Sequence, residues 1–225
     1  MKKIFVALAL AFAAGFTSQA GVISSFSDIQ YWAGTGANQS GLVIDFHDGT
    51  AQQSFVWGFR WDGSATGYDM ITAIDVASVE LSISSPSYIT SVSFLDDQGV
   101  NHSQVNGSFA VYPADYTSWG YYIAGGAATL FDSNPPYGPI GTVNPPGGGS
   151  SIPTSWTASP SGTSDRTLAD GSWDALSFGQ NDASFVHQVP PSSIAYAAIP
   201  EPCTLALALL ALAALVYARK RLYSH

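Results

Sequence analysis

Alternating apolar residues dominate the middle of this chain, and they constrain its fold more than any other feature. In the clearest case, large aromatic side chains occupy every second position and an Asp-Gly pair follows them: Phe55, Trp57, Phe59, Trp61, then Asp62-Gly63. Successive side chains of a β-strand point to opposite faces, so this period predicts a strand with one buried face. The Asp-Gly pair is typical of the turn that ends such a strand.

Shorter alternating or apolar runs predict further strands, at 42–47, 79–83, 88–95, 109–112, 119–123, 171–179 and 185–189. One short helix is expected that ends at about Ala77, with Ser64 or Thr66 as its cap, and Thr66 and Asp69 have the spacing of a capping box. The segment 131–160 contains two Asn-Pro-Pro triplets and a Gly-Gly-Gly-Ser run, which predict a loop or linker. The expected fold is mainly β, a sandwich-like single domain with one short helix.

The N-terminus has the layout of a secretory signal peptide. Lys2-Lys3 precede an apolar run, 4–16, and Ser18-Gln19-Ala20 places small residues at the −3 and −1 positions of a cleavage site. We expect a signal peptide at 1–20 with cleavage between Ala20 and Gly21. An uncleaved N-terminal anchor is the alternative, although the run is shorter than the ~20 apolar residues that cross a bilayer.

A second apolar segment lies near the C-terminus. Sixteen residues without a charge, 203–218, stand between Pro200-Glu201-Pro202 and Arg219-Lys220-Arg221. Basic residues beside a membrane helix stay cytoplasmic, so we expect a transmembrane helix that holds the preceding domain outside. Cys203, the only cysteine, cannot form an intrachain disulfide. We interpret it as a small apolar residue at the membrane interface, with lipidation or dimerisation as alternatives.

These three C-terminal parts, in this order and behind a signal peptide, resemble the PEP-CTERM sorting signal of Gram-negative bacteria. The resemblance covers only residues 200–222. It implies recognition of an inner-membrane-anchored precursor by an exosortase, processing near Pro200-Glu201-Pro202, and delivery to the cell surface or the exopolysaccharide matrix. Cys203 departs from the pattern, in which a small hydroxylated residue is more usual after the motif.

The region between the two signals, 21–199, is strongly acidic. The whole chain has a net charge of −9, but five of its seven Lys and Arg residues lie in the terminal signals. Two arginines, Arg60 and Arg166, remain beside fifteen acidic residues, which gives −13. Nucleic acid requires a basic surface, so it is not an expected partner. A domain with this charge is soluble and self-repelling.

The aromatic run at 55–61 also contains the first candidate binding site. Aromatic faces stack on sugar rings, while Arg and Asp side chains hydrogen-bond to sugar hydroxyls. Because Arg can stack on an aromatic ring and pair with a carboxylate, the following residues are a candidate glycan site for exopolysaccharide: Trp57, Arg60, Trp61 and Asp62. The alternative is an aromatic core face with one structural ion pair.

Two sets of residues in the sequence have side chains that could bind a cation. Asp45 and His47 are expected on one strand face, beside Asp48, as a divalent-ion site or an acid–base pair. The alternative is a solvated strand face, and no metal site is assigned because a third ligand is lacking. Asp96-Asp97 and Asp132-Ser133-Asn134 offer oxygen ligands for calcium, with ordinary turn residues as the alternative.

Catalytic signatures are lacking in the sequence. It contains no Gly-x-Ser-x-Gly, no His-Glu-x-x-His and no phosphate loop. The expected function is therefore a non-catalytic, structural or adhesive protein of the envelope or extracellular matrix. A carbohydrate-binding module is one alternative. A matrix polysaccharide hydrolase that uses a pair of the many Asp carboxylates is the other.

Overall fold

Three β-sheets and one α-helix form the fold in the computed structural model, which describes residues 20–108, 116–132, 138–184 and 186–198. The mainly β fold with one short helix is confirmed. Residues 1–19 of the predicted signal peptide, the sorting motif, the membrane segment, Cys203 and the basic cluster lie outside the described residues, as does the run at 109–112. Ala20 and Gly21, at the predicted cleavage site, are described, and Ala20 is buried. Within the described ranges, no helix has the length and apolar character that a membrane span needs.

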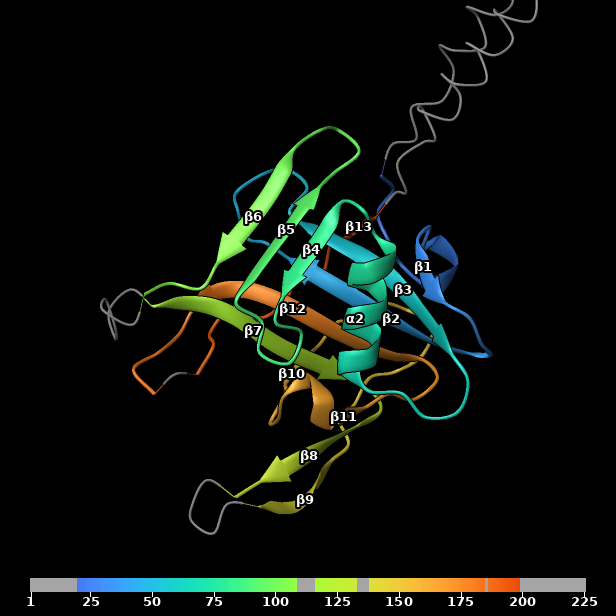
Figure 1. Cartoon of the computed structure of the whole chain (residues 1–225), viewed down its shortest axis with the longest axis vertical. Coiled ribbons are helices and arrows are strands. Elements are labelled where there is room, and N and C mark those ends of the chain that lie inside the picture. The colour runs from blue at the N-terminus through green and yellow to red at the C-terminus, as the bar shows by residue number, and fades with distance from the viewer. Residues whose placement is uncertain (1–19, 109–115, 133–137, 185, 199–225) are drawn as a thin grey trace, which may run out of the picture. The chain divides into compact units, whose positions relative to one another are not determined.

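A mixed seven-stranded sheet is the centre of the fold (Figure 1). Its strands in spatial order are β1 (Trp32–Gly34), β3 (Ser54–Trp61), β2 (Asn38–Asp45), β12 (Ser172–Gln180), β7 (Thr117–Ala124) and β10 (Thr157–Ala158), and β13 (Tyr196–Ala197) also pairs with β3. The adjacent pairs β2–β3 and β12–β7 are antiparallel, whereas β12 runs parallel to β2.

One face of this sheet is covered by α2 (Gly67–Ala77) and by an antiparallel sheet of β4 (Leu81–Ser84), β5 (Ser91–Leu95) and β6 (Asn101–Val105). Figure 1 shows these elements in front of the central strands. Trp57 of β3, Met70 of α2 and Phe94 of β5 belong to one buried hydrophobic cluster, so the helix and the small sheet share a core with the central sheet.

The opposite face is covered by the first and last described segments. Ile23, Ala195 and Trp173 belong to a second buried cluster, on which the short helix η1 (Phe26–Asp28) packs. Phe26 stacks on Trp173 with ring centroids 4.6 Å apart. Gly41 of β2 makes room for this ring, since a Cβ there would lie 2.3 Å from it. Both faces of the central strands are therefore buried.

This double covering corrects the prediction of half-buried strands. Leu42 and Ile44 face the first cluster as expected, but Val43, on the opposite face of β2, is equally buried in the second. The alternation with polar residues is weak in a strand that is covered on both sides, because neither face meets water. The predicted late strand at 171–179 is confirmed as β12, with Trp173 and Phe178 buried in different clusters.

The predicted helix is confirmed with its cap. The Thr66 hydroxyl accepts a hydrogen bond from the backbone N–H of Asp69 (3.2 Å), and the Asp69 carboxylate accepts one from the backbone N–H of Thr66 (2.9 Å). Met70, Ile71 and Ile74 lie on one face of α2 and are fully buried. Local capping and the apolar face therefore agree in placing the helix.

A third small sheet contains β11 (Arg166–Thr167), β8 (Ala127–Phe131) and β9 (Pro139–Val143), near the short helix η3 (Thr163–Asp165). The prediction that 131–160 lacks regular structure is wrong in part, because β9 and β10 lie inside it. β9 pairs with β8 although it contains Pro139 and Gly141, because the backbone of β8, which lies almost entirely outside 131–160, provides its partner. In the run at 185–189, the described residues form one isolated bridge, between Asn181 and His187.

Candidate functional site

The aromatic run of β3 faces the core. Trp57 is fully buried, Trp61 is only 6% exposed, and both lie in the cluster shared with α2 and β5. Phe59 and Trp61 stack on each other with centroids 5.4 Å apart. The structure thus shows the aromatic core face of the alternative interpretation. Trp57 and Trp61 present no platform to a glycan, because burying these large rings stabilises the fold more than exposing them.

Arg60 and Asp62 make separate contacts. The Arg60 guanidinium lies over the ring of Trp32, 4.6 Å from its centroid, which is a cation–π contact. The Asp62 carboxylate accepts a hydrogen bond from the backbone N–H of Ala37 (3.0 Å). Among the ion pairs of the described ranges, none joins Arg60 to Asp62. The four predicted glycan-site residues therefore do not share one exposed surface.

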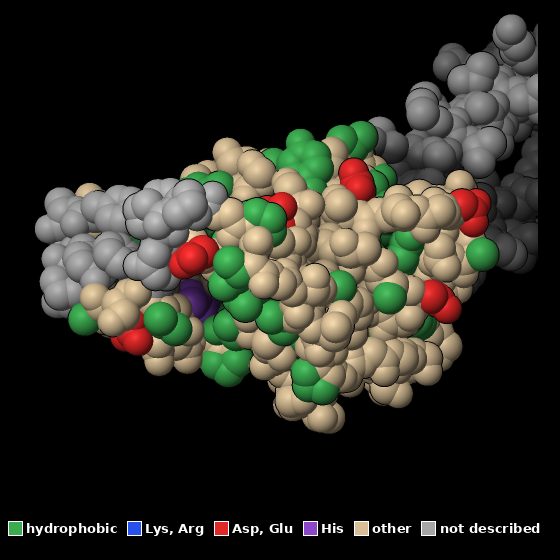
Figure 2. Space-filling view, turned by 90° about the horizontal axis from the view of Figure 1, so that it is seen from below, with side chains coloured by type: hydrophobic (Ala, Val, Ile, Leu, Met, Phe, Trp, Pro, Cys, Tyr) green, Lys and Arg blue, Asp and Glu red, His purple; other side chains and the backbone are tan. Residues whose placement is uncertain are grey.

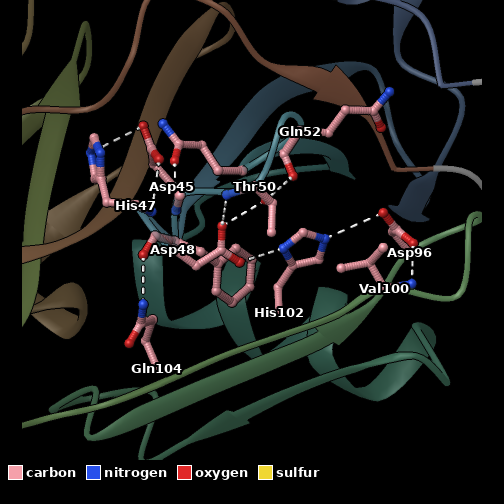
Figure 3. A network of polar contacts seen from close by, with 12 residues as sticks. Asp45, His47, Asp48, Thr50, Gln52, Asp96, Val100, His102 and Gln104 are labelled. Carbon is pink, nitrogen blue, oxygen red and sulfur yellow. Dashed lines mark hydrogen bonds and ion pairs between the residues drawn. The ribbon is translucent and has the colours of Figure 1, made fainter.

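The predicted Asp45–His47 contact occurs where β2 ends (Figure 3). His47 Nε2 lies 3.3 Å from the Asp45 carboxylate, at ion-pair distance but without hydrogen-bond geometry. The backbone φ of His47 is 45°, so the chain has already left the strand and the two side chains meet across a turn. The buried Asp45 carboxylate also accepts a hydrogen bond from the backbone N–H of Ser192 (2.7 Å).

Asp48 joins a different group, centred on His102 (Figure 3). His102 Nδ1 lies 2.6 Å from Asp48 Oδ2, and His102 Nε2 lies 3.3 Å from Asp96 Oδ2. The imidazole is fully buried, against the rings of Phe46 and Phe55. Because 54 positions separate Asp48 from His102, no local spacing in the sequence could have indicated this contact.

Hydrogen bonds determine the charge state of the Asp48 carboxyl. Burial alone raises its pKa, but hydrogen bonds from the Thr50 side chain, from His102 and from the Thr50 backbone outweigh burial, and its pKa lies below the usual value. Asp48 is therefore ionised at neutral pH, and its carboxylate faces Nδ1 of His102 as an anion.

The second carboxylate of this group has the turn role that the sequence predicts. Asp96 Oδ1 accepts hydrogen bonds from the backbone N–H groups of Gln98 (3.0 Å) and Val100 (2.7 Å), while Oδ2 contacts His102. His102 thereby joins the turn after β2 to the turn between β5 and β6. Its ring meets no solvent, so the arrangement suits a structural connection and not proton exchange with a substrate.

No metal-ligand group assembles from the predicted cation-site residues that the structure describes. Asp45 and Asp48 contact different histidines, and Asp96 points to His102. In the described ranges, no three His, Cys, Asp or Glu side chains are grouped as ligands. Residues 133–134 of the second predicted calcium loop lie outside these ranges.

Arg166, the second arginine of the acidic region 21–199 (the body of the protein), is fully buried. Arg166 binds Asp174 through Nε (2.9 Å) and Nη2 (2.8 Å), and the Tyr121 hydroxyl donates to the second Asp174 oxygen. Burial raises the pKa of Asp174, an effect that the Arg166 charge opposes. Arg166 also donates to the carbonyls of Ala127 and Thr167, so the ion pair ties β12 to the β8–β11 sheet.

A cleft of about 290 Å³ opens beside β7. Aromatic side chains from two segments line it: Tyr88 before β5, and Tyr116 directly before β7 with Trp119 and Tyr121 on β7. Asn181 and His187 line another part of its wall. These residues come from segments far apart in the sequence, and sequence analysis did not identify them as site residues, because no motif or spacing connects them.

Comparison with family models, with curated proteins and with solved structures finds no match for this chain.

Proposed function

We propose that the chain is the precursor of an exported, non-catalytic protein of the cell surface or exopolysaccharide matrix of a Gram-negative bacterium. The signal peptide, 1–20, directs export, and the apolar segment at 203–218 anchors the precursor in the inner membrane. An exosortase is the processing partner and acts near Pro200-Glu201-Pro202. The acidic body between the signals is the protein that reaches the exterior.

One observation supports this proposal most directly: the two ends of the body are hydrogen-bonded to each other just inside both predicted signals. The backbone N–H of Ala197 donates to the Gly21 carbonyl (2.9 Å), and that of Ile23 donates to the Ala195 carbonyl (2.8 Å). The described residues belong to one compact unit whose limits, Ala20 and Ile199, lie beside the predicted boundaries. Loss of both end segments therefore leaves the hydrogen bonds between Gly21–Ile23 and Ala195–Ala197 in place.

The surface of the body is consistent with a soluble extracellular protein. Figure 2 shows carboxylates spread over one face, and no Lys or Arg side chain is visible on the described part of that face. Arg60 and Arg166, the two cations of the body, contact Trp32 and Asp174. Such a net negative surface opposes self-association and contact with anionic lipid.

Two observations favour a non-catalytic body over a hydrolase. His102 is buried between two carboxylates, and Asp174 is buried against Arg166. Catalysis requires the acid or base to reach the substrate directly or through one water. These groups instead connect elements of the fold.

The test is intact-mass analysis of the full chain produced in a bacterial host with an exosortase and in the same host without it. We expect extracellular protein that begins at Gly21 and ends near Pro200 only in the first host. Replacing Pro200, Glu201 and Pro202 together by Ala should leave the protein membrane-bound and C-terminally intact. Val79→Ala, at a position 93% exposed on the body, is the control that should be processed normally. Extracellular protein that still carries 203–221 would overturn the proposal.

A further inference from the structure

We propose that the cleft beside β7 binds a single ring of a neutral saccharide. This goes beyond the export function, because it assigns the body a ligand. The cleft differs from the glycan site predicted on β3, whose tryptophans are buried. It is instead lined by Tyr88, Trp119 and Tyr121 together with hydroxyl and amide side chains.

The lining of the cleft indicates a ligand without charge. Asp, Glu, Lys and Arg are lacking among the described residues that line it. Contacts of Nδ1 with the Tyr122 hydroxyl (2.9 Å) and of Nε2 with the Ser118 carbonyl (3.1 Å) hold the His187 ring in place, and burial lowers its pKa, which favours the neutral ring. An ionised ligand would lose its hydration in the cleft and gain no counter-ion.

Aromatic and amide groups in the cleft match the two kinds of surface of a sugar ring. Tyr88 is 64% exposed and offers an amphipathic ring for the apolar face of a sugar. The Asn106 side chain is held in place, because its amide donates to the Ile89 carbonyl (3.0 Å) and its oxygen accepts from the Trp119 backbone N–H (3.0 Å). Such fixed groups lose little conformational entropy when a ligand binds.

The side-chain oxygen of a second amide residue, Asn181, is available to accept a hydrogen bond from a ligand. The Asn181 side-chain N–H donates to the Ser118 hydroxyl (2.7 Å), while its oxygen accepts no hydrogen bond from another described residue. A sugar hydroxyl is a suitable donor to this oxygen. A purely apolar ligand would leave the Asn181 oxygen without a hydrogen-bond donor, which disfavours it.

The size of the cleft limits the ligand. About 290 Å³ lies at the lower end of the usual range for small-molecule sites. One monosaccharide unit fits this volume, and the open side of the cleft lets the neighbouring units of a polysaccharide remain in solvent. A free sugar and a chain end therefore share the same recognition chemistry.

The test is binding to the full chain, purified in a detergent without a sugar headgroup. Titrations followed by calorimetry use neutral gluco-, galacto- and manno-trisaccharides, with a uronic acid trisaccharide as the anionic arm. The same sugars immobilised as polysaccharide distinguish a polymer from a free sugar. We expect saturable binding of at least one neutral sugar and none of the uronic acid form. This readout requires neither export nor processing, so it is independent of the sorting proposal.

Two variants locate binding in the cleft. Tyr88→Ala removes an exposed ring and should weaken binding about three- to tenfold. Gly162→Leu should abolish it by filling the cleft, since a Cβ at Gly162 meets only the Ser87 carbonyl, at an ordinary 3.5 Å, and leaves the fold intact. Tyr68→Ala, an exposed tyrosine of α2, is the matched control and should bind normally.

Three outcomes would overturn the proposal. The first is that none of the neutral sugars binds, free or immobilised. The second is that Tyr88→Ala and Gly162→Leu bind as the Tyr68→Ala control does. The third is that the uronic acid trisaccharide binds as well as the neutral ones, because the neutral lining would then not select the ligand.

Discussion

At the scale of single residues, burial decides what each of the two body arginines does. Arg60 is partly exposed and lies on Trp32, whereas Arg166 is fully buried against Asp174. A partly exposed cation–π contact contributes little to stability because water competes for the cation. A buried ion pair cannot lose one member without leaving a desolvated charge.

We therefore expect Arg166→Met to lower the free energy of unfolding by about 3–5 kcal/mol. Arg60→Met, the matched control, should cost about 1 kcal/mol. The double variant Arg166→Met/Asp174→Leu should recover part of the loss, since no buried charge remains unpaired. Urea unfolding measures all three. A double variant no more stable than Arg166→Met would show that the charge imbalance is not the cause.

The His187 imidazole gives the fold a pH dependence near neutrality. Burial lowers its pKa below the usual 6.5, so the folded state binds a proton less readily than the unfolded chain. The stability that the neutral ring provides is present above pH 6.5 and is lost as pH falls toward the lowered pKa. We expect the free energy of unfolding to fall between about pH 7.5 and about pH 5.5.

Replacing His187 by Gln removes the titrating group and should reduce this change, while His47 and His102 remain in both proteins. Denaturant unfolding at the two pH values measures the difference. Gln188→Ala, at the exposed next residue, is the control and should keep the pH dependence of the natural chain. Equal pH dependence in His187→Gln and the natural chain would contradict the assignment.

At the scale of elements, local sequence signals predicted α2 correctly but missed the strands within the segment 131–160. The capping box of α2 spans four residues, so the sequence alone contains it. β9 exists because β8 lies next to it, and nothing within 131–160 specifies that partner. Proline and glycine therefore indicated the irregular segment at 144–150 correctly and hid the strand that precedes it.

The cap of α2 can be tested directly. Thr66→Ala removes the hydroxyl that accepts from the Asp69 backbone N–H, and should lower the free energy of unfolding by about 1 kcal/mol. Thr66→Ser retains the hydroxyl and should remain close to the natural chain. Thermal and urea unfolding give the two values. A loss of similar size in both variants would mean that packing of the threonine methyl, and not the cap, is responsible.

At the scale of the whole molecule, the sheet is covered on both faces, and this decides where a ligand can bind. Trp57 and Trp61 lie beneath α2 and β5, so the most aromatic part of the sequence is core. Tyr88, which is exposed in the cleft, precedes β5 in the sequence. It lies near β7 only because the tertiary structure brings the two segments together. The pairing of Gly21 with Ala197 likewise brings the two ends of the body together.

The sequence by itself determined the features that depend on near neighbours: the strand alternation, the capped helix, the acidity of the body and the layout of its two end segments. Only the tertiary structure decided which faces are buried, that Asp48 and Asp96 share His102, and that a neutral cleft forms beside β7. The physical reason is the distance along the chain over which each interaction acts. Capping and alternation act over two to four residues, whereas burial and long-range contacts arise when distant segments pack to exclude water.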